Sequence, residues 1–270
     1  PNNGLNEQAL SELDDADVFK YLGDFEPVSS TNVGDGWTKH QFDPDGGNGP
    51  ICIAGTSYSA FTRAGKSNKL LIVEQGGGAC WQDSYNCNIL SESQEPPTAR
   101  VGIWDFDSKE NPFRDYSIVY MPYCDGSVHS GDNDVFDPAW QAFFEQLAGL
   151  PQGTGPLVRF HRGLRNQSAG MDLAKATFPK AKKITVTGSS AGGVGAAGLA
   201  PFLVRALYGN DVDLTVVNDA GPVAINLFAA DDILARANDW QLGQFYPASC
   251  ANCDVLGQPT AVIDWRLSND

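Results

Sequence analysis

The segment ITVTGSSAGG, residues 184–193, constrains the fold of this chain more than any other part of the sequence. It begins with β-branched residues typical of a strand, and the Ala- and Gly-rich residues after it continue at helical spacing to residue 208. Between them, Gly188 to Gly192 matches the G-x-S-x-G turn, which presents a serine in a strained conformation. The segment therefore predicts a strand, a sharp turn around Ser190 and a helix. The competing interpretation is a turn that only requires small residues.

Similar apolar runs recur along the chain and alternate with segments of helical periodicity. The predicted strands are residues 69–74, 117–121, 184–187 and 214–217, and the predicted helices are residues 138–150, 163–178 and 191–208. This alternation indicates an α/β fold with a mostly parallel sheet and helices on both faces. We expect an acidic N-terminal segment over residues 1–50, packed on one α/β domain that covers residues 51–270.

The predicted strands end in loops with unusual residues. In parallel sheets such loops meet at the carboxyl edge, where ligands bind. Residues 76–78 are three consecutive glycines after the first strand, and an oxyanion of acyl transfer requires preorganised backbone N–H donors. A second donor is expected directly after the serine, at Ala191. A phosphate cradle is the alternative for the glycines, but the Lys-Ser/Thr ending of a P-loop is absent from the sequence that follows.

The charge of the chain restricts its partners. The net charge is −15, and residues 1–50 hold ten Asp and Glu against two Lys. This balance disfavours nucleic acid and anionic membranes as partners, and no apolar run reaches 18 residues. The acidic segment is interpreted as a solvated surface, with an interaction arm as the alternative. No metal and no cofactor is expected.

Cysteine usage points to an oxidising compartment. The six cysteines form an even number, and the sequence shown starts at Pro1 without an initiator Met. We therefore expect a removed signal peptide, a secreted or periplasmic location and disulfide bonds. The candidates are Cys52, Cys80, Cys87, Cys124, Cys250 and Cys253. Cys250 and Cys253 could also form half of a zinc site or a redox pair.

Five motifs together resemble the pectin acetylesterase/Notum family, and most closely its bacterial branch. They are QGGGACW with Cys87, GIW with ENP, PYCDGSVHSG, HRG and GSSAGG, in this order. The resemblance implies an α/β-hydrolase fold and a secreted carboxylic-ester hydrolase or deacylase. Its substrate would be an acylated glycan, a protein or a small ester.

The resemblance also assigns roles to individual residues. Ser190 would be the nucleophile, and Gly77, Gly78 and Ala191 would supply the oxyanion N–H groups. Cys80 and Cys87 would form a local disulfide that restrains the glycine loop. His129, Asp125 and Asp219 would lie at the substrate pocket.

The activating histidine is missing from its expected place. The triad of α/β-hydrolases runs Ser, acid, His along the chain, whereas His40, His129 and His161 all precede Ser190. Three explanations stay open. The acid, the His and the last strands lie in a missing C-terminal segment or a second chain. Alternatively, His129 is the base, oriented by Asp125 or Asp132. Finally, the protein is an inactive hydrolase-like shell with a binding or structural role.

Overall fold

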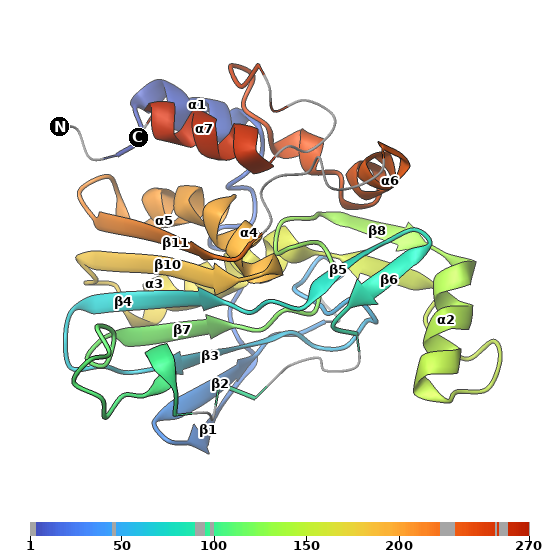
Figure 1. The fold of residues 1–270 in the computed structure, drawn as a ribbon, viewed down its shortest axis with the longest axis horizontal. Helices are drawn as coiled ribbons and strands as arrows, with labels where there is room; N and C mark the ends of the chain where they lie inside the picture. Colours follow the sequence, from blue (N-terminus) through green and yellow to red (C-terminus); the bar gives the residue numbers. More distant parts are fainter. Residues whose placement is uncertain are drawn as a thin grey trace.

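The computed structural model describes residues 4–44, 47–89, 95–97, 100–221, 230–251, 253 and 259–269. Within these residues the chain folds around a seven-stranded sheet (Figure 1). In spatial order its strands are β1 (Ser29–Gly34), β2 (Trp37–Gln41), β3 (Ser59–Arg63), β7 (Ser117–Met121), β4 (Lys69–Glu74), β10 (Lys183–Ser189) and β11 (Asp213–Asp219).

The sheet is mostly parallel in direction. β7, β4, β10 and β11 pair in parallel, whereas β1, β2, β3 and β7 pair in antiparallel fashion. Within this described sheet, β1 and β3 are therefore the only strands that run antiparallel to the other five. The predicted α/β fold is confirmed, and the four predicted strands correspond to β4, β7, β10 and β11.

The central strands are buried on both faces. Along β4, Leu70 and Ile72 pack into one apolar core, while Leu71 and Val73 pack into another. The first core contains side chains of α3 (Gly163–Thr177) and α5 (Ala200–Tyr208). In the described residues, the second face is covered by aromatic side chains around the 3-10 helix η1 (Gly102–Trp104). Burial on both faces explains why these strands read as continuous apolar runs.

One predicted helix is wrong in its extent. Residues 191–208 form two helices, α4 (Ala191–Ala197) and α5, which meet at a bend of 43°. The reason is Pro201 in the first turn of α5, since a proline ring clashes with the carbonyl four residues earlier, here that of Ala197. Because of Pro201, the chain changes direction between α4 and α5, which one continuous helix would not allow.

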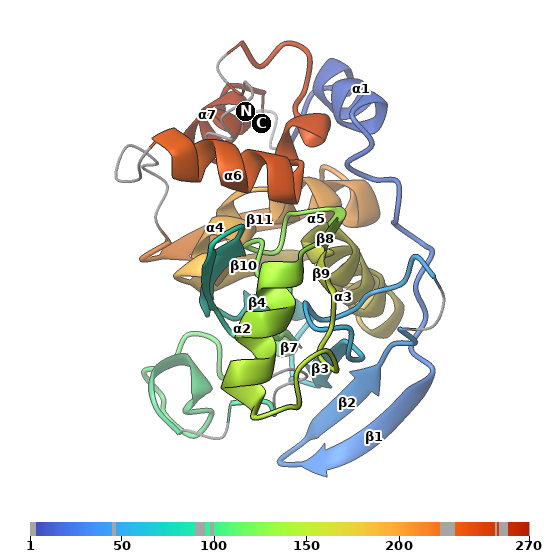
Figure 2. The same ribbon diagram turned by 90° about the vertical axis from the view of Figure 1, so that its right-hand side faces the viewer.

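Two small two-stranded sheets lie beyond the carboxyl ends of the parallel strands (Figures 1 and 2). One pairs β5 (Gly78–Trp81) with β6 (Ser84–Cys87). The other pairs β8 (Asn133–Phe136) with β9 (Val158–His161), and α2 (Pro138–Ala148) connects these two strands. β5, β6, β8 and β9 were not predicted from the sequence, because strands of four residues carry little periodicity.

Among the described residues, four further helices are α1 (Glu7–Asp15), α6 (Ala230–Trp240), the 3-10 helix η3 (Leu242–Phe245) and α7 (Pro259–Asn269). α1, η3 and α7 add side chains to the core that contains α3 and α5, whereas α6 contacts β5. The start of α1 meets the end of α7, where the backbone N–H of the N-cap residue Asn6 donates to the carbonyl of Asn269 at 3.0 Å. From the acidic segment 1–50, β1 and β2 extend the main sheet, since β2 pairs with β3.

The six cysteines form three disulfides, namely Cys52–Cys124, Cys80–Cys87 and Cys250–Cys253. In the described part of the chain, no single helix is long and apolar enough to cross a membrane, and only the bent pair of α4 and α5 reaches the required length and composition.

Candidate active site

Ser190 occupies a strained turn between β10 and α4. Its φ of 55° and ψ of −120° lie in a region that side-chain-bearing residues rarely adopt, and such strain costs about 1–3 kcal/mol. The side chain is exposed, while Ala191 directly after it is buried. The turn is held by two backbone bonds: the N–H of Ser190 donates to the carbonyl of Asp219 at 3.0 Å, and that of Val194 donates to the carbonyl of Ser190 at 3.2 Å.

The glycines on either side of Ser190 are required by close backbone contacts. A Cβ on Gly188 would strike the carbonyl of Gly192, and a Cβ on Gly192 would strike the carbonyl of Glu74. The turn thus rests directly on the end of β4. These contacts distinguish it from a turn in which small residues are merely tolerated.

The glycine loop after β4 touches the serine turn. A Cβ on Gly76 would lie 3.1 Å from the Cβ of Ser190 and would overlap the carbonyl of Ser189. Gly77 and Gly78 follow, and Gly78 opens β5 with a φ of 79°. Two segments more than 100 residues apart therefore lie against each other at the carboxyl edge of the sheet.

The Cys80–Cys87 disulfide closes the hairpin that follows the glycine loop. Its Cα atoms are 5.5 Å apart, and Gly78 is paired with Cys87 across the two strands. On the other side, the indole N–H of Trp240 in α6 donates to the carbonyl of Cys80 at 2.8 Å. α6 thus fastens the hairpin to the body of the protein.

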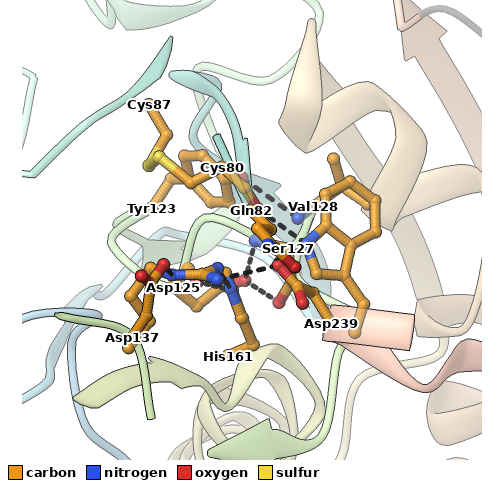
Figure 3. The surroundings of a disulfide bond; sticks show 12 residues. Cys80, Gln82, Cys87, Tyr123, Asp125, Ser127, Val128, Asp137, His161 and Asp239 are labelled. Carbon is orange, nitrogen blue, oxygen red and sulfur yellow. Dashed lines mark hydrogen bonds and ion pairs between the residues drawn. A yellow bond between two sulfur atoms is a disulfide. The ribbon is translucent and has the colours of Figure 1, made fainter. Parts of the chain in front are cut away.

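A buried ion network lies next to this hairpin (Figure 3). The fully buried guanidinium of Arg159 contacts Asp137 at 3.0 Å and Asp239 at 2.9 Å, and it donates to Nε2 of His161 at 2.6 Å. Asp239 in turn accepts from the backbone N–H of Gln82 at 2.6 Å. This network was not predicted from the sequence. Arg159 and His161 share β9, but the two aspartates come from separate segments, and only the helical spacing of residues 230–240 could have indicated α6.

His161 serves this network as a neutral acceptor. Its Nδ1 donates to the carbonyl of Asp125 at 3.0 Å, so Nε2 is free to accept from Arg159. Burial, together with the positive charge of Arg159, lowers the pKa of His161 to about 3. A histidine held in this way is a structural hydrogen-bonding group.

The other two histidines are also engaged. His40 lies on β2, where its ring nitrogens contact the hydroxyls of Ser30 and Thr62, both at 2.8 Å. His129 is fully buried, and its Nε2 donates to the carbonyl of Gln75 at 2.9 Å, directly before the glycine loop. His129 therefore lies behind that loop, whereas Ser190 is exposed.

Asp125 and Asp219 occupy different environments. Asp125 is buried and accepts hydrogen bonds from the backbone N–H and the hydroxyl of Ser127. Asp219 is the last residue of β11, lies next to the serine turn and is exposed. Asp132 is bound in an ion pair with Arg165 at 2.6 Å and with Lys20 at 2.8 Å.

Glu74 is a member of the site region that the sequence analysis did not single out. It ends β4, its side chain is buried, and burial raises its pKa to about 7 against the opposing effects of His129 and Gln167. An acidic residue at the end of an apolar strand was the available signal. Among the described residues, no group of three or more His, Cys, Asp or Glu side chains is arranged to hold a metal ion.

The sequence of this chain is similar to a protein family and to one curated relative. The family model described as pectinacetylesterase matches residues 44–225, which include the glycine loop and the serine turn. The palmitoleoyl-protein carboxylesterase notum2 of Xenopus laevis is 26% identical over 154 residues. That match covers 53% of this chain and 28% of the frog protein, so the chain spans well under half of the length of this relative.

Proposed function

Because this chain belongs to the pectinacetylesterase family, we propose that it contributes the nucleophile and the oxyanion hole of a serine carboxylic-ester hydrolase. One observation carries the proposal: Ser190 is exposed at a strained strand-to-helix turn, and the glycine loop lies in contact with that turn. Strain of this kind persists only where the surrounding structure enforces it, and it concentrates at functional sites.

The proposed reaction is a two-step acyl transfer. The hydroxyl oxygen of Ser190 attacks the ester carbonyl, and a general base takes the hydroxyl proton. The negative charge on the carbonyl oxygen is stabilised by the N–H groups of Gly77, Gly78 and Ala191. The alcohol then leaves with a proton, and water hydrolyses the acyl-enzyme to release the acid and restore the serine.

We further propose that the base and its orienting carboxylate come from outside residues 1–270. The support is that His40 and His161 are bound to other groups and that His129 is buried with its Nε2 occupied. His129 instead supports the glycine loop from behind. A second chain or a further segment of the same polypeptide would then have to bring a histidine to the exposed side of Ser190.

The proposed substrate is an acyl ester, carried by a glycan, a protein or a small molecule. The disulfides Cys52–Cys124 and Cys80–Cys87 agree with secretion, since such bonds persist in oxidising compartments. The frog relative is described as acting on a palmitoleoylated protein. A protein acyl ester is therefore included among the substrates to be tried.

The test uses the full-length protein with p-nitrophenyl acetate and a fluorophosphonate probe. We expect hydrolysis by the wild type, labelling at Ser190 in a peptide map, and loss of both in Ser190→Ala. Ser268→Ala makes the same chemical change on the exposed surface of α7 and should leave turnover unchanged. Turnover that survives Ser190→Ala would refute the nucleophile. A wild type without hydrolysis or labelling would instead favour a binding or assembly protein with a hydrolase-like fold.

A further inference from the structure

The carbonyl side of the glycine loop is held at three successive peptides. The carbonyl of Gln75 accepts from Nε2 of His129 at 2.9 Å. The carbonyl of Gly76 accepts from the side-chain amide Nδ2 of Asn88 at 3.3 Å, and that of Gly77 accepts from the backbone N–H of Asn88 at 2.8 Å. One residue, Asn88, thus binds two neighbouring peptides, one through its side chain and one through its main chain.

Holding a carbonyl also fixes the direction of an N–H group. A trans peptide is planar, so the N–H of the following residue points opposite to the carbonyl of the same peptide. The carbonyl of Gly76 shares its peptide with the N–H of Gly77, and the carbonyl of Gly77 shares its peptide with the N–H of Gly78. Asn88 therefore directs the N–H groups of Gly77 and Gly78 away from itself.

Asn88 is itself restrained. It follows Cys87, which is bonded to Cys80 and paired with Gly78. The backbone N–H of Cys80 donates to the carbonyl of Gly126 at 2.8 Å, so the hairpin is also tied to the loop after β7. The contact with the glycine loop is close, since a Cβ on Gly77 would overlap the side-chain amide of Asn88.

We propose that Asn88 is the positioning residue of the oxyanion hole, because it orients the two glycine peptides whose N–H groups would receive the substrate oxygen. This inference rests on the proposed function of Ser190. Glycine has the widest range of backbone conformations of any residue, so the direction of these N–H donors must be restrained by contacts with other residues. Orientation fixed before the substrate arrives makes such donors effective, because no reorganisation is needed during the reaction.

The decisive variant is Asn88→Asp in the full-length protein. It keeps the size of the side chain and the backbone N–H bond to Gly77, but it replaces the amide donor by an oxygen that repels the carbonyl of Gly76. Removing an oxyanion donor outright costs roughly 10²–10³ in kcat, so misorientation of one peptide should lower kcat by roughly 10- to 100-fold. KM for p-nitrophenyl acetate should change little, because the donors act chiefly on the transition state.

Inhibition by phenylboronic acid separates positioning from general damage. The boronate forms a tetrahedral adduct with a serine and places an oxygen in the oxyanion hole, so its inhibition constant should rise in parallel with the loss of kcat/KM. Asn86→Asp is the matched control. Asn86 is exposed two residues earlier on the same hairpin, and its substitution makes the same change of charge. Kinetics and boronate affinity should stay unchanged in this variant.

A kcat of Asn88→Asp within threefold of the wild type would overturn the positioning role and leave the proposed function intact. An equal loss in Asn86→Asp would do the same, because it would attribute the effect to charge. If Asn88→Asp unfolds, Asn88→Ser supplies the comparison, since it shortens the side chain without adding charge, and Asn86→Ser becomes its control. A kcat of Asn88→Ser within threefold of the wild type, or an equal loss in Asn86→Ser, would overturn the positioning role. Absence of hydrolysis in the wild type would instead refute the function on which the inference rests.

Discussion

The carboxyl group of Glu74 accepts a hydrogen bond of 2.8 Å from Nε2 of Gln167, which lies 93 residues further along the chain. The other carboxyl oxygen lies where a Cβ on Gly195 would be, so it contacts the helix that begins after Ser190. Glu74 therefore joins β4, α3 and α4 beneath the serine turn. A carboxyl group in this position can carry charge only at a cost, because it is buried.

Glu74→Gln should reduce the loss of stability with rising pH. Burial raises the pKa of Glu74 from 4.5 to about 7 in the folded protein, so the unfolded chain ionises first. The stabilising contribution is complete below pH 4.5 and is lost as the pH rises through 7. Between pH 5 and 8 the free energy of unfolding of the wild type should therefore fall relative to that of Glu74→Gln by on the order of 3 kcal/mol, and its melting temperature should fall with it.

Thermal unfolding of both proteins at each pH measures this difference directly. Asp172 has a pKa raised to about 6 by burial, so it adds a change of the same sign to both proteins. The comparison must therefore be made between wild type and variant at each pH. Parallel curves for the two proteins would show that Glu74 is already ionised in the fold at pH 5.

Gly192→Ala should disrupt the serine turn. The added Cβ would overlap the carbonyl of Glu74 and approach the carbonyl carbon of Gln75 at 2.8 Å, and neither backbone atom can move independently of the sheet. We expect a destabilisation of roughly 1–3 kcal/mol, typical of overpacking, and loss of fluorophosphonate labelling at Ser190. Gly243→Ala is the control, because a Cβ there meets no atom within 4 Å. Equal melting temperatures of the two variants would contradict the predicted contact.

Removal of the Cys80–Cys87 disulfide should affect both stability and turnover. The two cysteines are seven residues apart in the sequence, so the bond closes a short loop. For a loop of this size the chain-entropy model gives a stabilisation of about 2–3 kcal/mol. The double variant Cys80→Ala/Cys87→Ala should lower the melting temperature and kcat, because the bond restrains the strand that pairs with Gly78.

The same double substitution at Cys250 and Cys253 provides the comparison for turnover. This disulfide lies beside α7, where Sγ of Cys250 contacts the carbonyl of Ala261 at 3.7 Å, and the glycine loop is elsewhere. We expect a lower melting temperature with unchanged kcat. If removal of Cys80–Cys87 likewise spared kcat, the disulfide would have no part in ordering the glycine loop.

The central strands could be predicted because their burial is recorded in their own residues. Residues 69–74 and 117–121 match β4 and β7 at both ends, since each run has an uninterrupted apolar stretch, residues 70–73 and 118–121. The hairpin of β5 and β6 could not be predicted in this way. Its position depends on the Cys80–Cys87 bond and on α6, both of which are contacts between separate segments.

The candidate site was only partly accessible from the sequence. A G-x-S-x-G turn and a triple glycine are local patterns, and the parallel sheet brings them to one edge. The surroundings of His129 could not be predicted from the sequence, because its burial behind the glycine loop depends on how the loop after β7 packs against Gln75. Asn88 had no local signature at all.

By itself, the sequence determined the strand–turn–helix around Ser190, the positions of the central strands along the chain and the run of three glycines after β4, since all three depend on local backbone preference and apolar periodicity. The tertiary structure alone decided which polar groups meet. Gln167 reaches Glu74, and Asn88 and His129 bind the carbonyls of the glycine loop, only after the sheet has brought distant segments together. Hydrogen bonds require atoms within about 3 Å, and no local pattern specifies such a distance between segments far apart in the chain.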